Sequence, residues 1–437
     1  MMRRRTAAYK WLYPGLGVKR WLLLLLLGIT TLGLGLAHVL YEVYTSTLVS
    51  SPVWRTLTLS FLPRWARTVC VALLGLGVAA FAIYRLSHSL LAAVVPPGGP
   101  SLVDVVYRHR QRQRGPKVVV LGGGNGLNTL LRGLKRYTDH ITAIVTVADD
   151  GGSSGRLRRE LGVLPPGDFR NCIAALADDE ALITQLFQYR FASPPTGNDA
   201  GRSLDGHSFG NLFITAMAGV TGSFERALVE SGRVLAIRGR ILPSTLENVT
   251  LNADLVDDET SAVRRVVGES AIPQARQPIE RVYLEPADVP AYPPAVRAIL
   301  DADLIIAGPG SLFTSVLPNL LVEDIVRAVR ASHALKVYVC NVATQQGETE
   351  GFDVGDHVRA LERHSEPELF PFVLANSNLN SQPPADWNFT QVAPTIPPGA
   401  SYQLILADVV DEQRPWRHDP DKLARTLMEW YANNVKT

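Results

Sequence analysis

The sequence contains only three cysteines in 437 residues: Cys70, Cys172 and Cys340. They lie far apart, so neither a CxxC pair nor another zinc-ligand spacing is present. This scarcity excludes a disulfide-stapled scaffold and suits a domain in a reducing cytosol. Hydrophobic residues make up 46% of the chain and charged residues 19%, which excludes a chain that is disordered throughout.

Acidic residues are almost missing from the first quarter of the chain. Residues 1–116 hold 14 Lys and Arg but only 2 Asp and Glu, whereas the whole chain has 43 and 41. The remaining residues are therefore net acidic and offer no electrostatic footprint for a phosphate backbone. We expect no nucleic acid among the partners, and we attribute the basic excess to a membrane.

Two long apolar runs, at 21–44 and 68–84, lie within this basic region. The first is long enough for a helix to cross a hydrocarbon core of roughly 30 Å, and residues 86–95 can extend the second. A secretory signal peptide is the alternative for the first run, but no small-residue cleavage site follows it. We predict a membrane anchor with two transmembrane helices over residues 1–100.

The distribution of basic residues predicts the orientation of this anchor. Arginines and lysines cluster before the first run and after the second, while the connection at 45–65 has few. The positive-inside rule then places both termini in the cytoplasm. We expect a multi-pass cell-membrane protein with the lipid bilayer as a partner, a basic juxtamembrane linker at 101–116 and a cytoplasmic domain at 117–437.

From residue 117 onward, short apolar runs alternate with helical periodicity. A strand at 117–121 precedes a helix with Leu127, Leu130, Leu131 and Leu134 on one face, and a second strand follows at 141–148. Further strands are predicted at 303–308, 336–343, 372–376 and 403–409, and helices at 169–190, 209–220, 314–331, 354–364 and 419–434. This order is typical of an α/β fold with a Rossmann-like parallel sheet. Three β-rich stretches within 233–286 predict an antiparallel insertion.

Glycine-rich turns follow two of these strands. The first contains Gly123, Gly124, Asn125 and Gly126; the second contains Gly308, Gly310 and Ser311, with Thr314 opening the next helix. At such junctions backbone N–H groups and the helix dipole favour an anion, so the two turns together could hold a diphosphate. A purely structural tight turn is the alternative. The GxGxxG fingerprint fails at Leu127 and no Walker lysine follows, so we expect no NAD or flavin.

Polar residues follow the strand at 141–148. Asp149 and Asp150 are adjacent, and a flexible turn with Gly152, Ser153, Ser154 and Arg156 comes next. Paired carboxylates can hold Mg²⁺ or accept ribose hydroxyls, so Asp149 and Asp150 are the candidate metal ligands. Solvated loop acids are the alternative.

The other candidate ligand-binding residues lie near predicted helix starts or strand ends: Asp168, Asn171, His207, Asn211, Gln345 and Arg417. Asp168 could instead cap the helix that follows it. A serine hydrolase built on His207 and Ser208 is disfavoured because the sequence has no GxSxG motif. Contact with an anion or a metal is the preferred interpretation, and the pattern identifies no catalytic residue.

Several motifs in this order resemble the gluconeogenesis factor (YvcK-like) branch of the CofD family. They are KVVVLGGGNGLNTLLRGLK, VTVADDGGSSGRLRRELGVLPPGDFRNCIAAL, GHSFGNLFITAM, GES at 268–270, GPGSLFTSVLPNLLV and TQQGET. The resemblance is strong over 117–365 and weaker over 366–437. Asn125 stands where Thr is usual and Gln346 where Pro is usual, and the segment 377–400 departs from the family pattern.

The resemblance implies a CofD-type fold and binding of a UDP-sugar, in particular UDP-N-acetylglucosamine. It also implies an influence on cell-wall synthesis and cell shape during growth on gluconeogenic carbon. A membrane-tethered UDP-sugar-binding regulator is therefore the first expectation. The CofD branch itself comprises Mg²⁺-dependent transferases that move a phospholactyl-type group from a guanylyl donor to a deazaflavin alcohol. A Mg²⁺-dependent phosphotransferase with an unknown acceptor is the alternative, and a homo-oligomer is left open.

Overall fold

The computed structural model describes residues 110–435 except 179, 193–203, 258–261 and 381–388, together with isolated positions between 26 and 107. The chain divides into two compact units, Met1–Gln111 and Arg112–Thr437. Apart from isolated helical positions, the predicted membrane spans lie outside the described residues. The fold below is that of the second unit.

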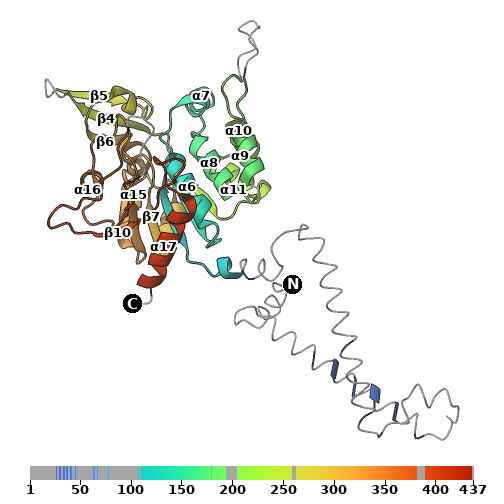
Figure 1. Cartoon of the computed structure of the whole chain (residues 1–437). Helices are drawn as coiled ribbons and strands as arrows, with labels where there is room; N and C mark the ends of the chain where they lie inside the picture. Colours follow the sequence, from blue (N-terminus) through green and yellow to red (C-terminus); the bar gives the residue numbers. More distant parts are fainter. Residues whose placement is uncertain are drawn as a thin grey trace. The chain divides into compact units, whose positions relative to one another are not determined.

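In the part of the chain that the structure describes, a seven-stranded parallel sheet forms the centre of this unit (Figure 1). Its strands, in their order across the sheet, are β10 (Gln403–Ala407), β9 (Phe372–Asn376), β8 (Leu335–Val339), β7 (Leu304–Ala307), β1 (Val118–Gly122), β2 (Ile141–Val145) and β3 (Arg240–Pro243). Every residue of β1 is buried, as expected for a strand that is covered on both faces. The predicted α/β fold with a parallel sheet is confirmed.

The strand order reverses at the centre of the sheet. From β1 the chain continues outward to β2 and β3, and β7 then returns to pair with the other side of β1. The strands β8, β9 and β10 extend the sheet in the opposite direction. In open α/β sheets, ligands bind at the carboxyl ends of the strands on either side of such a switch point.

A second, three-stranded antiparallel sheet is inserted between β3 and β7. It consists of β4 (Thr250–Val256), β5 (Val263–Val267) and β6 (Ile279–Glu285), with β4 in the middle. Figure 1 shows it as a small sheet of its own. The predicted antiparallel insertion is thus present. The first of its three predicted β-rich stretches, however, does not belong to it. Residues 240–243 form β3, because Ile241 and Leu242 are buried as β3 pairs in parallel with β2.

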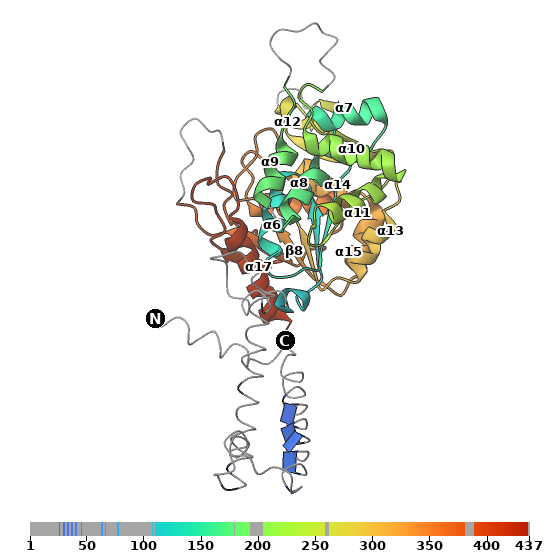
Figure 2. The ribbon, with the colours of Figure 1, turned by 90° about the vertical axis from the view of Figure 1, so that its right-hand side faces the viewer.

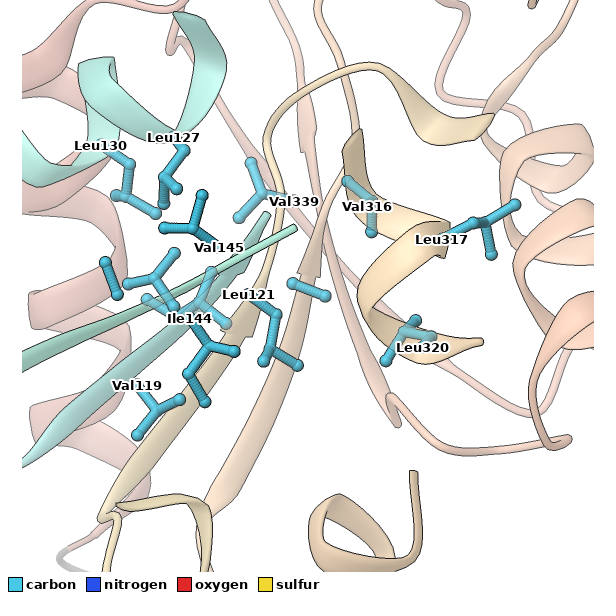
Figure 3. Packing of buried hydrophobic residues seen from close by; sticks show 14 of the residues in the cluster. Val119, Leu121, Leu127, Leu130, Ile144, Val145, Val316, Leu317, Leu320 and Val339 are labelled. Atoms are coloured by element: carbon cyan, nitrogen blue, oxygen red, sulfur yellow. The ribbon is translucent and has the colours of Figure 1, made fainter. Parts of the chain in front are cut away.

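Helices cover both faces of the main sheet. Their bounds are α6 (Gly124–Leu134), α7 (Gly152–Leu161), α8 (Gly167–Leu176), α9 (Glu180–Gln188), α10 (Phe209–Thr221), α11 (Phe224–Val234), α12 (Ile272–Ala275), α13 (Pro293–Leu300), α14 (Leu317–Leu320), α15 (Glu323–Ala331), α16 (Val354–His364) and α17 (Pro420–Asn434). Figure 3 shows Leu127 and Leu130 of α6 on one side of the strands and Leu317 and Leu320 of α14 on the other. The predicted leucine face of α6 is fully buried. Helices α8, α10 and α11 pack together beside α6 (Figure 2).

Three predicted segments differ from the structure. The helix predicted at 169–190 is two helices, because Ala177 becomes extended and forms a β-bridge with Ile237. The helix predicted at 314–331 starts as a π-helical turn at Leu312–Val316, continues as α14 and breaks before α15, where Val322 is extended. The flexible turn predicted after Asp150 is the first part of helix α7.

Among the described residues, no single helix is long and apolar enough to cross a membrane. Helices α10 and α11 reach the required length and composition only as a pair, across a bend of 116°.

Candidate functional site

The carboxyl ends of β1 and β7 are neighbours, and each leads into a glycine-rich turn. The two turns touch. A Cβ atom on Gly126 would lie 2.6 Å from the carbonyl carbon of Pro309 and 2.7 Å from the backbone nitrogen of Gly310. Glycine is therefore required at position 126 by the close approach of two backbones. The turns that the sequence singled out separately form one structure at the switch point.

A cavity of about 680 Å³ lies against both turns. Its lining residues are Gly124, Asn125, Gly126, Thr129, Glu269, Gly310, Ser311, Ser315, the segment 341–346, Phe389, Trp416, Arg417 and His418. Pockets of roughly 300–1,000 Å³ are typical of sites that enclose a small organic ligand. Seven predicted site residues line this cavity: Gly124, Asn125, Gly126, Gly310, Ser311, Gln345 and Arg417. Among the described lining residues, Glu269 is the acidic residue and Arg417 the basic residue other than histidine.

Side chains from the loop after β8 hold the second glycine turn in place. Asn341 donates from Nδ2 to the carbonyl of Gly310 (2.8 Å) and accepts the N–H of Gly310 at Oδ1 (3.1 Å). Gln345 donates from Nε2 to Oγ of Ser311 (2.6 Å). The Asn341 side chain thus satisfies both backbone polar groups of Gly310, as a neighbouring strand would. Gln345 was predicted as a ligand contact, and the structure gives it this positioning bond as well.

The first glycine turn is tied to α8 by Asp168. The backbone of Gly124 is in the left-handed region (φ +62°), which favours glycine. Its N–H donates to the carboxylate of Asp168. A Cβ on Gly123 would lie 2.6 Å from Oδ2 of Asp168, so this approach also needs glycine. Pro166 occupies the N-cap of α8, so the capping role considered for Asp168 is wrong.

Several buried carboxylates have raised pKa values, and one of them, Glu269, lines the cavity. Burial, reinforced by Asp149, raises the pKa of Asp168 to about 6. Burial also raises the pKa of Glu269 to about 8, with Asp149, Asp168 and Asp150 adding to the shift. The pKa of Glu348 rises to about 7 through burial, although a hydrogen bond from Thr314 opposes it. Burial is thus the main cause of all three raised pKa values, and neighbouring carboxylates add to it at Asp168 and Glu269.

The positions of these carboxylates decide whether they could hold a divalent cation. Among the described residues, no group of three or more His, Cys, Asp or Glu side chains is placed to hold a metal ion. Mg²⁺, however, commonly uses only one or two carboxylates together with phosphate oxygens of its substrate. Asp149 and Asp168 provide such oxygens, and each raises the pKa of Glu269. Asp149 and Asp168 are therefore the carboxylates that would hold a Mg²⁺ ion together with a bound phosphate.

Asp150 has a structural contact of its own. Its Oδ1 accepts the N–H of Ser270 (2.9 Å), and Gly268 is at φ +102° with no room for a Cβ beside the Asp150 carboxylate. This contact anchors the turn that carries Glu269 to the end of β2. Asp149 accepts the N–H of Gly151 (2.9 Å). The two adjacent acids predicted as metal ligands therefore have different surroundings.

Four further predicted residues, Ser153, Ser154, His207 and Asn211, form a buried polar network. Ser153 bonds to Nδ1 of His207 (2.9 Å) and accepts from Nδ2 of Asn211 (3.0 Å), which also reaches Ser154 (3.5 Å). This network joins the start of α7 to the start of α10. None of these four residues lines the cavity.

Arg156, Asn171 and Thr314 likewise lie outside the lining of the cavity. Arg156 donates to the carbonyl of Asp205 (2.6 Å), and Asn171 accepts from Nη2 of Arg170 (2.8 Å). Gly152 (φ +46°) is the first residue of α7, and Gly308 (φ +79°) directly follows β7.

Sequence reasoning missed several lining residues: Glu269, Asn341, Phe389, Trp416 and His418. The GES element at 268–270 and the Arg417–Asp419 helix start were visible signals for Glu269 and His418. Phe389 lies in the segment 377–400, which departs from the family pattern, and no local signal identifies it.

The chain is similar to known proteins of one family. The family model for the 2-phospho-L-lactate transferase CofD matches residues 118–435. A protein of Nostoc sp. is 46% identical over 442 residues, which cover 97% of this chain and 92% of that protein. The gluconeogenesis factor of Bacillus subtilis is 44% identical over 326 residues, which cover 72% of this chain and 98% of that protein.

A solved structure shows the same fold. The crystal structure of a UPF0052 family member from Bacillus halodurans is 41% identical and superimposes with a TM-score of 0.63. The superposition covers 72% of this chain and 99% of that chain. The chain therefore belongs to the gluconeogenesis factor branch of the CofD family.

Proposed function

We propose that the cavity binds a UDP-sugar, in particular UDP-N-acetylglucosamine, and that this binding regulates cell-wall synthesis and cell shape during growth on gluconeogenic carbon. The observation that carries the proposal is the pair of touching glycine turns at the switch point. Both turns line the cavity, and no lysine is among its described lining residues. Backbone N–H groups are then the natural donors to a diphosphate.

The surroundings of the turns also suit a diphosphate ester. Arg417 is exposed at the cavity, where its guanidinium can pair with phosphate oxygens in a two-pronged contact. Asn125 is exposed on the first turn and adds a neutral amide. The volume of about 680 Å³ leaves room beside the phosphates for the rest of a nucleotide sugar.

A thermal-shift panel of UDP-, GDP- and ADP-linked sugars against the full-length protein tests the proposal. UDP-N-acetylglucosamine should raise the melting temperature most, because ligand binding to the folded state adds to stability. Arg417→Ala should weaken the affinity by roughly tenfold, as expected for one lost charge-assisted hydrogen bond. Arg226→Ala, at an exposed position in α11, is the matched control. A panel without any shift from nucleotide sugars would contradict the proposal.

A Mg²⁺-dependent phosphotransferase is the second candidate function. Two observations favour it: the match to the CofD model and the acidic cluster of Asp149, Asp168 and Glu269, of which Glu269 lines the cavity. Mg²⁺ would supply neutralisation of charge on the transferring group. Asp149 and Asp168 would orient the ion, and the glycine turns would bind the phosphates. Incubation with UDP- and GDP-activated donors, Mg²⁺ and candidate acceptor alcohols would give product only if this function is present.

We further propose that residues 1–100 tether the domain to the cell membrane and that the domain lies on the cytoplasmic side. The support is the two apolar runs with basic flanks, together with a family match that begins only at residue 118. Protease added outside intact cells should reach only residues 45–65. Digestion of the domain at 117–437 from that side would overturn this topology.

A further inference from the structure

Two arginines from separate segments meet at one turn outside the cavity. Arg156 of α7 donates from Nη2 to the carbonyl of Asp205 (2.6 Å). Arg190, two residues after the end of α9, donates from Nη1 to the carbonyl of Gly206 (2.9 Å). Because these carbonyls are consecutive in the chain, both guanidinium groups lie at the same turn. Neither arginine lines the cavity.

A third arginine reaches the same place from α8. Arg170 donates from Nη1 to Oγ of Ser208 (2.7 Å). Ser208 forms an antiparallel β-bridge with Arg190, and residues that are paired in this way project their side chains on one face. Burial lowers the pKa of Arg170, and the positive charge of Arg190 adds to this shift. The guanidinium groups of Arg170 and Arg190 are therefore close enough to repel each other.

Backbone contacts hold the turn in position. The N–H of Phe191 donates to the carbonyl of His207 (3.0 Å), and the N–H of Gly206 donates to the carbonyl of Phe191 (2.8 Å). Gly206 is in the left-handed region (φ +72°), and a Cβ on it would lie 3.1 Å from Nη2 of Arg156. Glycine therefore lets this guanidinium lie close against the turn. The scaffold brings the arginines together without a ligand.

The contacts with carbonyls do not neutralise Arg156 and Arg190. Among the described residues, neither arginine forms an ion pair with a carboxylate, and Asp205 meets Arg156 through its backbone carbonyl. Only Arg170 has acids nearby, since Asp168 and Asp149 oppose the fall in its pKa. A guanidinium has five N–H donors, and one carbonyl occupies one of them. The turn therefore offers an anion both positive charge and further donors.

The number of charges indicates the kind of anion. Arginine forks match the paired oxygens of a carboxylate or a phosphate. A carboxylate carries one negative charge, whereas a phosphate group carries about two near neutral pH and has three acceptor oxygens. Three guanidinium groups from three segments therefore suit a phosphate group better than a carboxylate.

We propose that Arg156, Arg170 and Arg190 form a second anion site, which binds the phosphate group of a small molecule. The arginines lie outside the cavity that we assign to the nucleotide sugar, so the inference does not depend on the proposed function. It gives the domain a place for a second, phosphorylated ligand, which can be bound at the same time as the nucleotide.

Calorimetry with the full-length protein tests the site, with inorganic phosphate and ribose 5-phosphate as probes at constant ionic strength. Arg190→Gln should weaken phosphate binding by roughly tenfold, as expected for one lost charge-assisted hydrogen bond. Glutamine removes the charge but can still donate to the carbonyl of Gly206. Arg156→Gln should have an effect of similar size. Arg190→Lys keeps the charge but loses the fork, so its effect should be smaller.

Two further substitutions locate the bound phosphate. Arg226→Gln changes an exposed arginine in α11 and should leave the affinity unchanged. Arg417→Ala removes the arginine of the cavity, so the loss caused by Arg190→Gln should be equally large in that background. Melting temperatures identify any variant that fails to fold, and Arg190→Lys then carries the test.

The two probes also distinguish the source of the phosphate group. Tighter binding of ribose 5-phosphate would identify a phosphate ester as the ligand, and tighter binding of inorganic phosphate would identify the free ion. Either result supports the site, provided that the binding depends on Arg190 and Arg156.

Four outcomes overturn the inference. The first is that the unmodified protein binds neither probe, and the second is that Arg190→Gln and Arg156→Gln both keep full affinity. The third is that acetate binds as tightly as phosphate, because the site would then be one for carboxylates. The fourth is that the loss in Arg190→Gln disappears in the Arg417→Ala background, because the phosphate would then occupy the cavity. A protein that binds phosphate through Arg190 but binds no UDP-sugar would refute the proposed function alone.

Discussion

Replacing Gly126 by Ala tests whether the contact between the two glycine turns builds the ligand cavity. The new Cβ would lie 2.6 Å from the carbonyl carbon of Pro309 and 2.7 Å from the nitrogen of Gly310. Both are backbone atoms and cannot rotate away, so the turns must separate. Overpacking of this kind typically costs about 1–3 kcal/mol of stability. We expect that loss in the free energy of unfolding, and an affinity for UDP-N-acetylglucosamine weaker by roughly tenfold or more, equivalent to one lost charge-assisted hydrogen bond.

Two other glycine substitutions separate stability from binding. A Cβ on Gly133 in α6 would lie 2.6 Å from Cβ of Ala424 in α17, and Gly133 does not line the cavity. Gly133→Ala should therefore destabilise the protein without changing its affinity. Gly219 in α10 has no atom within 4 Å of the added Cβ. Alanine is the better helix former, so Gly219→Ala should stabilise the protein by roughly 0.5–1 kcal/mol and leave binding unchanged.

Urea unfolding measures the stability of each variant, and calorimetry measures its affinity at a temperature where all are folded. The reasoning is refuted if Gly126→Ala binds the ligand as tightly as the unmodified protein. It is also refuted if Gly133→Ala loses affinity to the same extent, because the effect would then be one of stability alone.

Three further changes probe the charges of the site. Asn125→Asp should place a negative charge beside the diphosphate and weaken UDP binding by roughly tenfold or more at low salt, with little change in melting temperature. Unchanged affinity in calorimetry would argue against an anion at this turn. The raised pKa of Glu269, about 8, means that the folded protein retains a proton that the unfolded chain releases near pH 4.5. Stability in metal-free buffer should therefore fall as the pH rises from about 4.5 to about 8, and Glu269→Gln should flatten this dependence in urea titrations; an identical slope in both proteins would contradict the shift. Changing Asp149 to Asn should abolish the Mg²⁺-dependent part of nucleotide affinity, and an unchanged Mg²⁺ response would show that Asp149 holds no metal.

The sheet could be predicted from the sequence because its strands are short apolar runs buried on both faces. Runs such as 117–121 and 303–308 are typical of strands at the centre of a parallel sheet. Helix α7 could not be predicted in the same way. Its start, rich in glycine and serine, has the composition of a turn, and it is helical because Ser153 is buried and bonded to His207 and Asn211. Those partners come from a segment about fifty residues away in the sequence.

In the site, too, the residues that could be predicted are those with a local sequence signal, and the others depend on contacts between distant segments. The glycine turns and Arg417 could be identified because a strand end or helix start is visible in the local sequence. Glu269 reaches the cavity from the inserted antiparallel region, anchored by the bond from Ser270 to Asp150. Phe389 reaches it through pairing with the loop after β8. Only the folded chain brings these segments together, so the GES element marked Glu269 without placing it at the cavity, and no local pattern identified Phe389.

A crystal structure of the protein with UDP-N-acetylglucosamine would test the proposed binding mode most directly. We expect the diphosphate within hydrogen-bond distance of backbone N–H groups in both turns, Gly124–Gly126 and Gly310–Ser311, and of the Arg417 guanidinium. Density for the bound nucleotide elsewhere on the domain, with these turns making no contact to it, would contradict the proposal.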